Sequence, residues 1–154
     1  MATIRFHETT TATPEEFVAG LTDFGPGRSK LFKNSADGYL DVHSLGANRA
    51  DVTEGSAGIW ERLDYDWSDP RHITLTTTDS NLFGGASGHT YTLTPQPDGT
   101  TVIDAVLVRE GKNLRGRVVA YFIGTVGRRT LTKAFAGTVK AIEARSKAGA
   151  AKRS

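Results

Sequence analysis

The chain has 154 residues, of which 38% are hydrophobic and 23% charged, and its formal net charge is +2. This is the composition of a single globular domain, long enough to bury a core without a disulfide or a structural metal. The lack of cysteine excludes thiolate chemistry, and without an apolar leader or a run of about 18 apolar residues we expect a cytoplasmic protein with no stable membrane insertion.

The first part of the chain predicts a strand followed by a pair of short helices. Ile4–Thr10 alternates in polarity and is rich in threonine, as a strand is. Thr13-Pro14-Glu15-Glu16 is a capping box with proline at the first helical position, which predicts a helix start. Gly25-Pro26-Gly27 ends that helix, and Arg28–Lys33 predicts one or two further helical turns.

From Gly38 onward the hydrophobic period changes to two. Six segments alternate like strands and are separated by Gly, Asn, Asp or Pro clusters at hairpin spacing. These segments are Tyr39–Leu45, Ala50–Glu54, Ile59–Trp67, His72–Thr78, His89–Pro95 and Thr101–Arg109. Six strands in succession predict an antiparallel meander.

The last third predicts one long amphipathic helix, from about Asn113 to Ser146. An i, i+4 stripe begins with Leu114, Val118, Phe122 and Val126. The stripe resumes with a small offset over Leu131–Ile142. Gly124 and Gly127 fall at the junction, where they indicate a bend or a place of close packing against the backbone. The close packing is either a tight crossing on a strand or room for a ligand.

Charge is distributed unevenly along the chain. Residues 1–97 hold 7 Lys/Arg against 13 Asp/Glu, whereas residues 98–154 hold 12 against 4. Basic helices can bind nucleic acid or anionic lipid. However, the arginines are spread around the helix. The pattern of aromatic residues between basic ones, which is typical of a site for single-stranded nucleic acid, is only weakly present. We therefore interpret the basic face as solvated and expect no nucleic-acid partner.

The order strand, helix pair, six-strand meander and long terminal helix resembles the START-like or helix-grip superfamily, particularly its polyketide cyclase/dehydrase-like (SRPBCC) members. The matching residues are Ala12–Phe17, Trp60–Tyr65, Asp69-Pro70-Arg71 and Pro95–Val102, and the resemblance covers roughly residues 3–147. It implies an α+β fold in which a curved antiparallel sheet of about seven strands wraps around a long C-terminal helix, with a short helix pair between strands 1 and 2. It also implies a deep hydrophobic cavity between sheet and helix, holding lipids, sterols, polyketides or other apolar molecules.

We accordingly expect a single START-like domain over residues 1–147 and a disordered tail over 148–154. Pockets of this kind are mostly apolar, with a few polar groups that set the orientation of the ligand. Strand alternation and the helix stripe give the expected ligand-binding residues, each of which could instead be ordinary core. They are Tyr65, Trp67, Leu75, His89, Tyr91, Leu93, Val118, Phe122 and Val126. The last three are expected to roof the cavity, whereas Leu131–Ile142 is expected to pack as solid core.

Few polar residues are candidates for chemistry. His89 can project inward as a hydrogen-bonding or proton-transfer group, or can be a satisfied core histidine. The strand Thr101–Arg109 is apolar on both faces, so either Asp104 or Arg109 could point into the cavity. The four histidines show no ligand spacing, so we expect neither a metal nor a cofactor. Gly84–Gly88 matches no phosphate-binding motif and is interpreted as a hairpin loop or pocket lid.

Two functions fit this reading. The first is a carrier or sensor of a small hydrophobic ligand, which predicts a nearly apolar pocket with one or two polar groups. The alternative is a polyketide cyclase or dehydratase that folds its substrate and transfers protons, which predicts at least two inward titratable groups within hydrogen-bond reach. The sequence favours the first, leaves catalysis and the identity of the ligand open, and is compatible with a monomer or a homodimer.

Overall fold

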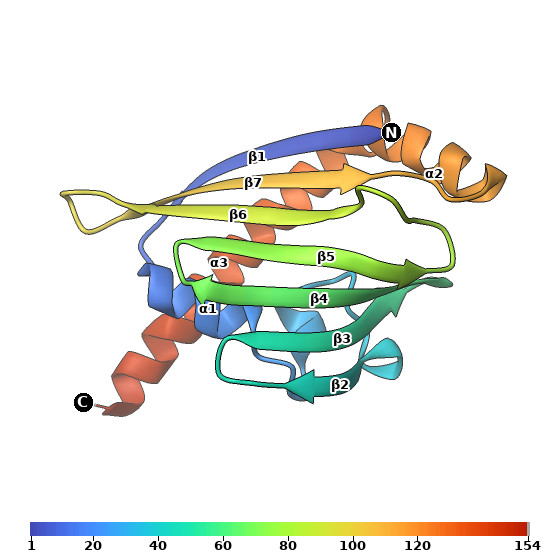
Figure 1. Ribbon diagram of the computed structural model, residues 1–154. Helices are drawn as coiled ribbons and strands as arrows, with labels where there is room; N and C mark the ends of the chain where they lie inside the picture. Colours follow the sequence, from blue (N-terminus) through green and yellow to red (C-terminus); the bar gives the residue numbers. More distant parts are fainter. Residues whose placement is uncertain (154) are drawn as a thin grey trace.

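A computed structural model describes residues 1–153 as one antiparallel sheet with helices on one face (Figure 1). The strands are β1 (Ala2–Thr10), β2 (Asp41–Leu45), β3 (Arg49–Ser56), β4 (Ile59–Asp69), β5 (His72–Ser80), β6 (Gly88–Pro95) and β7 (Thr101–Arg109). Their order in the seven-stranded sheet is β1-β7-β6-β5-β4-β3-β2. The six-strand meander is therefore confirmed, and the first strand of the chain pairs with the last.

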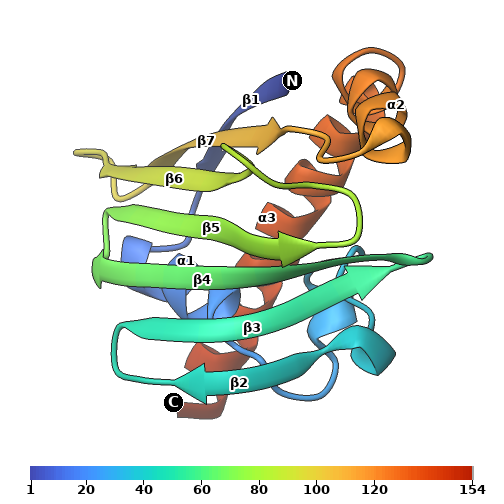
Figure 2. The ribbon, with the colours of Figure 1, turned by 45° about the vertical axis from the view of Figure 1, so that its right-hand side comes forward.

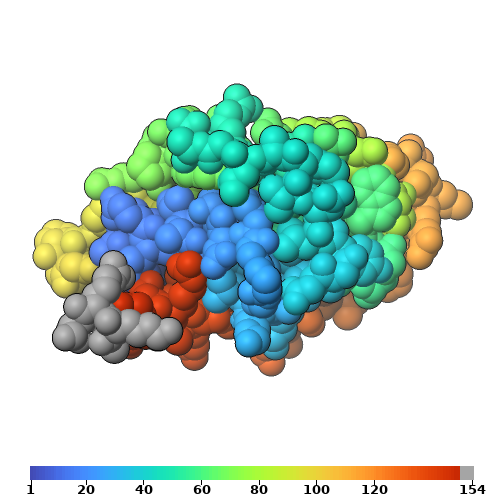
Figure 3. Space-filling view, turned by 90° about the horizontal axis from the view of Figure 1, so that it is seen from below, coloured from blue at the N-terminus to red at the C-terminus, as the bar shows by residue number. Residues whose placement is uncertain are grey.

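The helices are α1 (Pro14–Leu21), the short 3-10 helices η1 (Arg28–Lys30) and η2 (Asp37–Tyr39), α2 (Leu114–Gly124) and α3 (Arg128–Arg153). In two views α3 runs behind the sheet, across the direction of the strands (Figures 1 and 2). Seen from below, α1 and the segment after it pack beside α3 (Figure 3). The α+β architecture and the helical segment between the first two strands are thus as predicted. No helix in the part of the chain that the structure describes is long and apolar enough to cross a membrane.

The start of α1 follows from its capping residues. The Thr13 hydroxyl oxygen accepts from the Glu16 backbone N–H at 3.1 Å, and the Thr13 N–H donates to Glu16 Oε1 at 3.3 Å. These two bonds satisfy backbone donors that the first helical turn leaves free. Phe17 and Leu21 then fall on the buried side of the helix, facing the sheet.

The core lies between the inward face of the sheet, α1 and the C-terminal half of α3. Alternate residues of the central strands are buried, as a period of two requires. Leu63, Tyr65, Ile73, Leu75, Tyr91 and Leu93 are all in this core. From α3, Val139 and Ile142 pack against the same cluster. The expectation that the end of the terminal helix is solid core holds for these two residues.

The terminal helix is not continuous, because the chain turns between α2 and α3, at the position where the two glycines indicated a bend. The backbone N–H groups of Thr125 and Gly127 both donate to the Phe122 carbonyl, at 3.3 and 2.8 Å. A Cβ at Gly124 would lie 3.1 Å from the Cβ of Ala2, so this glycine lets the helix pack closely on β1. Gly124 therefore marks the tight crossing rather than room for a ligand.

At the other end, α3 continues to Arg153 and so includes residues 148–153 of the predicted tail. Ser154 lies outside the described residues. A single domain over residues 1–147 stays a prediction.

Replacing either of two helical glycines by alanine should change the free energy of unfolding, but in opposite directions. A Cβ at Gly116 in α2 would collide with the Leu82 carbonyl oxygen, so we expect Gly116→Ala to lower the free energy of unfolding by about 1–3 kcal/mol. A Cβ at Gly137 in α3 meets no atom within 4 Å, so Gly137→Ala should raise it by about 0.5–1 kcal/mol. Urea denaturation measures both values, and changes of the same sign would contradict this packing.

Candidate functional site

An internal cavity of about 480 Å³ lies between the sheet and α3. This volume is within the range of about 300–1,000 Å³ that is usual for small-molecule pockets. Its apolar lining includes Phe6, Leu63, Leu75, Phe83, Ala105, Leu107, Ile123, Leu131 and Phe135. Its polar lining includes Arg28, Ser35, Glu54, Glu61, Tyr65, His89, Tyr91, Arg109 and Thr138. The cavity is therefore apolar in area but contains two buried arginines and two glutamates.

The cavity opens toward one end of the sheet. Among its lining residues, Lys33, Asn34, Ala57 and Ala134 are exposed and so mark the opening. They come from the segment after η1, the turn between β3 and β4, and α3. That turn and α2 lie at the same end of the sheet (Figure 2).

The first charged group in the wall, which we call the Arg28 cluster, consists of Arg28, Ser35, Glu54 and Tyr65. Arg28 Nε donates to Glu54 Oε1 at 2.6 Å, and Arg28 Nη2 donates to Tyr65 Oη at 3.1 Å. Ser35 Oγ donates to Glu54 Oε1 at 2.8 Å, and the Tyr65 hydroxyl donates to Glu54 Oε2. The side chains of Arg28 and Glu54 are only 1% and 9% exposed, so the pair is held away from water.

Aromatic rings complete the surroundings of this guanidinium. The rings of Phe24 and Phe32 lie with their centroids 4.7 and 4.5 Å from Arg28 Cζ, as cation–π contacts do. Burial, and then the charge of Glu54, raise the pKa of Tyr65 well above its usual value of 10. Tyr65 is therefore a neutral donor, and Glu54 accepts three hydrogen bonds from the protein itself.

The second charged group, the Arg109 cluster, consists of Arg109, Glu61, Thr77 and His89. Arg109 Nη2 donates to Glu61 Oε1 at 2.8 Å and to His89 Nε2 at 2.9 Å. Thr77 Oγ1 donates to Glu61 Oε2 at 2.9 Å, and the Phe83 ring lies 5.1 Å from Arg109 Cζ. Arg109 is thus the charged residue of β7 that faces the cavity.

The other candidate on β7 faces away from the cavity. Asp104 is exposed on the outer side of the sheet, where its Oδ1 lies 2.7 Å from His7 Nδ1. Alternation along β7 puts Asp104 and Arg109, five residues apart, on opposite faces. Of the two candidates on this strand, Arg109 therefore points into the cavity and Asp104 does not.

His89 is held as a neutral imidazole with a defined tautomer. A guanidinium can only donate, so the Arg109 hydrogen bond requires a lone pair on His89 Nε2 and leaves the proton on Nδ1. Burial, and then the charge of Arg109, hold the pKa of His89 well below 6.5. His89 Nδ1 is buried and has no hydrogen-bond partner in the described part of the chain. A buried donor left in this state costs about 1–3 kcal/mol, which a bound acceptor can recover.

Tyr91 provides a second hydrogen-bond donor next to His89. The His89 and Tyr91 ring centroids are 6.3 Å apart, and Phe135 of α3 lies 6.4 Å from Tyr91 on the other side. The hydroxyl of Tyr91 makes no hydrogen bond to any residue that the structure describes. Burial, and then the charge of Glu54, raise the pKa of Tyr91 to about 12, so the hydroxyl keeps its proton. Two neutral donors without protein acceptors therefore lie side by side in the cavity wall.

The fold is shared with several solved structures, although neither a protein-family model nor a curated protein matches the sequence. The structure of TTHA0849 from Thermus thermophilus aligns with a TM-score of 0.72 at 15% identity, over 94% of this chain and 99% of that one. A START superfamily protein from Mycobacterium smegmatis aligns with a TM-score of 0.66 at 11% identity, over 94% and 97%. The chain has the START-like helix-grip fold.

A third structure links this helix-grip fold to an enzyme. The Zhui aromatase/cyclase from Streptomyces sp. R1128 aligns with a TM-score of 0.63 at 15% identity, over 94% of both chains. At identities this low the likeness shows the fold alone. The fold expected from the sequence is confirmed.

Four of the expected ligand-binding residues line the cavity of the helix-grip fold, namely Tyr65, Leu75, His89 and Tyr91. Trp67 and Leu93 also face inward, but they pack in the solid core away from the cavity.

Val118, Phe122 and Val126 do not line the cavity, and their exposed fractions are 47%, 54% and 75%. The expected roof is wrong because the turn after Gly124 directs this stripe outward. Leu131 and Phe135 of α3 roof the cavity in its place.

Sequence reasoning missed Arg28, Glu54 and Glu61. Strand alternation contained the signal for the two glutamates, since Glu54 shares a face with Val52, and Glu61 shares a face with Leu63. Arg28 lies in a segment without periodicity, so only the contact with Glu54, 26 residues away, reveals its role.

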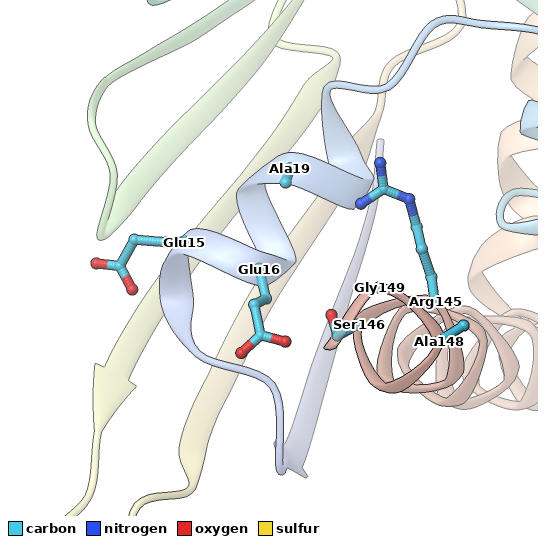
Figure 4. A pocket seen from close by; sticks show the side chains of 7 residues that line it. All are labelled: Glu15, Glu16, Ala19, Arg145, Ser146, Ala148 and Gly149. Atoms are coloured by element: carbon cyan, nitrogen blue, oxygen red, sulfur yellow. The ribbon is translucent and has the colours of Figure 1, made fainter. Parts of the chain in front are cut away.

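A second hollow, of about 550 Å³, lies between α1 and the end of α3 (Figure 4). Two of its three charged residues already serve the fold, because Glu16 caps α1 and Arg145 Nη2 pairs with Asp23 Oδ2 at 3.1 Å. Within the described residues no group of three or more His, Asp or Glu side chains could hold a metal ion. The cavity under α3 is therefore the candidate site.

The buried neutral His89 should make stability depend on pH. An unfolded chain binds a proton on this imidazole below about pH 6.5, whereas the folded chain does not, so the free energy of unfolding falls as pH falls. Between about pH 7.5 and 5.5 the loss in wild type should exceed that in His89→Gln by about 1.4 kcal/mol. Urea denaturation at a series of pH values measures the difference. As the matched control, His72→Gln, which changes an exposed histidine, should keep the wild-type pH dependence, and equal curves for wild type and His89→Gln would contradict the assignment.

Proposed function

We propose that the cavity binds a small, neutral, mainly apolar molecule that carries carbonyl or hydroxyl oxygens, and that the protein acts as its carrier or sensor. The observation that carries this proposal is the buried donor His89 Nδ1, which has no acceptor in the described part of the chain and lies beside Tyr91 in the cavity wall. Buried donors are normally satisfied. An oxygen of a bound ligand would supply the missing acceptor.

The apolar lining supplies the affinity in this proposal. Phe6 and Leu75 from the sheet and Phe135 from α3 line the cavity. Transfer of apolar ligand surface from water to such a lining contributes about 25 cal/mol for each Å². The donors then orient the molecule rather than hold it, as is typical of hydrophobic pockets.

The charge of the wall supports a neutral ligand. The formal charges of Arg28 and Arg109 cancel those of Glu54 and Glu61, and each guanidinium already donates to a carboxylate. A ligand carboxylate would have to lie next to these carboxylates and would lose its hydration. A ketone, ester or alcohol avoids both costs. The likeness in fold to a START superfamily protein and to an aromatase/cyclase also supports small-molecule binding.

Binding can be tested with prodan, a neutral naphthyl ketone whose fluorescence shifts to the blue in apolar surroundings. We expect saturable binding to wild type and loss of binding in Ala105→Phe, because the new ring fills the cavity at a residue that lines it. Tyr91→Phe should weaken binding about threefold to tenfold, the effect of one neutral hydrogen bond. Thr92→Val, an outward-facing neighbour on the same strand, is the matched control and should bind as wild type does.

The outcomes separate binding from misfolding. Circular dichroism establishes that each variant is folded, and native mass spectrometry of freshly purified protein reveals an apolar molecule that has copurified. Prodan bound equally well by wild type and a folded Ala105→Phe would place the probe outside the cavity and overturn the proposal. No saturable binding, with no copurified molecule, would do the same.

A second candidate function, a cyclase or dehydratase of a polyketide-like substrate, is favoured by one observation. Glu61, Arg109 and His89 are joined by direct hydrogen bonds in the cavity wall, so titratable groups do lie within hydrogen-bond reach. A neutral imidazole N–H and a tyrosine hydroxyl can polarise a carbonyl and stabilise the enolate that forms in an aldol reaction. The cavity would then also fix the conformation in which the chain closes.

This candidate predicts turnover of a linear diketone whose intramolecular aldol condensation gives a cyclohexenone and water. Wild type should accelerate formation of the enone, which is followed by its ultraviolet absorbance. His89→Gln should lower the rate about 100-fold, the contribution typical of a donor that stabilises a developing oxyanion, while it weakens prodan binding no more than Tyr91→Phe does. A wild-type rate equal to that in buffer would exclude this function and leave the carrier or sensor.

A further inference from the structure

Helix α2 has an apolar stripe on its solvent side, which we call the α2 surface. It consists of Leu114, Val118, Tyr121, Phe122 and, just after the helix, Val126, with exposed fractions between 47% and 77%. The spacing i, i+4, i+7, i+8 places the first four on one face of the helix. The opposite face, with Gly116 and Ala120, is buried against the rest of the protein. This helix is therefore apolar toward both the core and the solvent.

Two arginines flank this stripe, and Lys112, just before the helix, pairs with Asp79 at 3.5 Å. Arg115 and Arg117 fall on its two sides when α2 is projected at about 100° per residue. Residues 111–142 contain seven basic residues, which are Lys112, Arg115, Arg117, Arg128, Arg129, Lys133 and Lys140. The same range contains no Asp or Glu. A solvated basic face does not explain the segment, because its centre is apolar.

We propose that the α2 surface docks on a membrane surface that contains anionic lipid. A helix with an apolar stripe between arginines lies in the plane of such an interface, with the apolar side chains at the boundary between headgroups and acyl chains. The arginines lie at the edges of the stripe, from where their long side chains reach the lipid phosphates. The rings of Tyr121 and Phe122, with centroids 6.0 Å apart, present the amphipathic aromatic surface that is typical of this depth.

Charge also argues against a second copy of this chain as the occupant. A symmetric dimer contact places the same patch of both copies face to face. Arg115 and Arg117 of each copy would then meet like charges, with no carboxylate in residues 111–142 to pair with them. An anionic lipid surface complements both the charge and the apolar stripe.

The proposal goes beyond the proposed function and does not rest on it, although the two surfaces are close. Ile123, on the inner side of α2, lines the cavity. Ile59, at the start of β4 and also in the cavity lining, packs against the cluster under α2. Docking through the α2 surface would therefore bring the end of the molecule with the cavity opening toward the lipid (Figures 1 and 2).

Sedimentation with vesicles tests the proposal. We expect the full chain to sediment with vesicles of phosphatidylcholine and phosphatidylserine in equal parts, to bind pure phosphatidylcholine weakly, and to be released as salt is raised. Tyr121→Ser with Phe122→Ser should reduce binding about tenfold or more. Arg115→Gln with Arg117→Gln should reduce it about fivefold for each arginine. Val42→Ser with Leu45→Ser, two exposed apolar residues on β2, is the matched control and should bind as wild type does.

The proposal is overturned if wild type fails to bind the anionic vesicles, if it binds neutral vesicles equally well, or if the β2 control loses as much binding as the α2 variants. Sedimentation equilibrium without lipid tests the other occupant. A wild-type dimer that becomes monomeric in the Tyr121→Ser, Phe122→Ser variant would assign the α2 surface to a second copy. Prodan binding of each variant in solution verifies the cavity separately, so failure of docking and failure of the cavity function are distinguished.

Discussion

Charges in the wall of a cavity must be neutralised within the protein. The ion pairs that do this join the segment after α1, β3, β4 and β7. The Arg28–Glu54 pair joins the segment after α1 to β3, and Tyr65 extends the contact to β4. The Arg109–Glu61 pair joins β7 to the same strand β4, across the two strands between them. Removing one partner of such a pair leaves a buried charge, which costs about 3–5 kcal/mol. A slip of β4 by one residue would break both clusters at once, so they specify its register.

The same clusters help explain why a cavity persists in a small domain. At one end of the sheet α1 and Val139 of α3 fill the interior, whereas near the opening α3 presents the small residue Ala134. Guanidinium and carboxylate groups fixed by hydrogen bonds cannot move into the space as aliphatic side chains would. The wall is therefore rigid, and within the described residues His89 Nδ1 has hydrogen-bonding capacity that the protein does not use.

The sequence specified the parts that depend on local rules. A period of two located all the strands, and the capping box located α1, because both signals arise from neighbouring residues. It failed where long-range contacts decide. Two glycines indicated a bend near Gly124, but not that Phe122 would lie on the surface instead of in the expected roof. Arg28 pairs with Glu54 of β3, and no periodicity in the sequence predicts this contact. In β7, with apolar residues on both faces, pairing with β1 and β6 decided that Arg109 is inside.

The pairing of β1 with β7 has a consequence for the order in which the molecule forms. Phe6 lies opposite Ala105 in this ladder, so the contact joins residues 99 positions apart. During synthesis β1 has no partner until β7 has left the ribosome, and α3 follows later still. Such distant contacts slow folding, because a long loop must close before they stabilise the chain. The central hairpins β3 to β6 can pair first, which leaves β1 as an unpaired edge exposed to other chains. Nascent protein should therefore depend on rapid completion of its C-terminal third to escape aggregation.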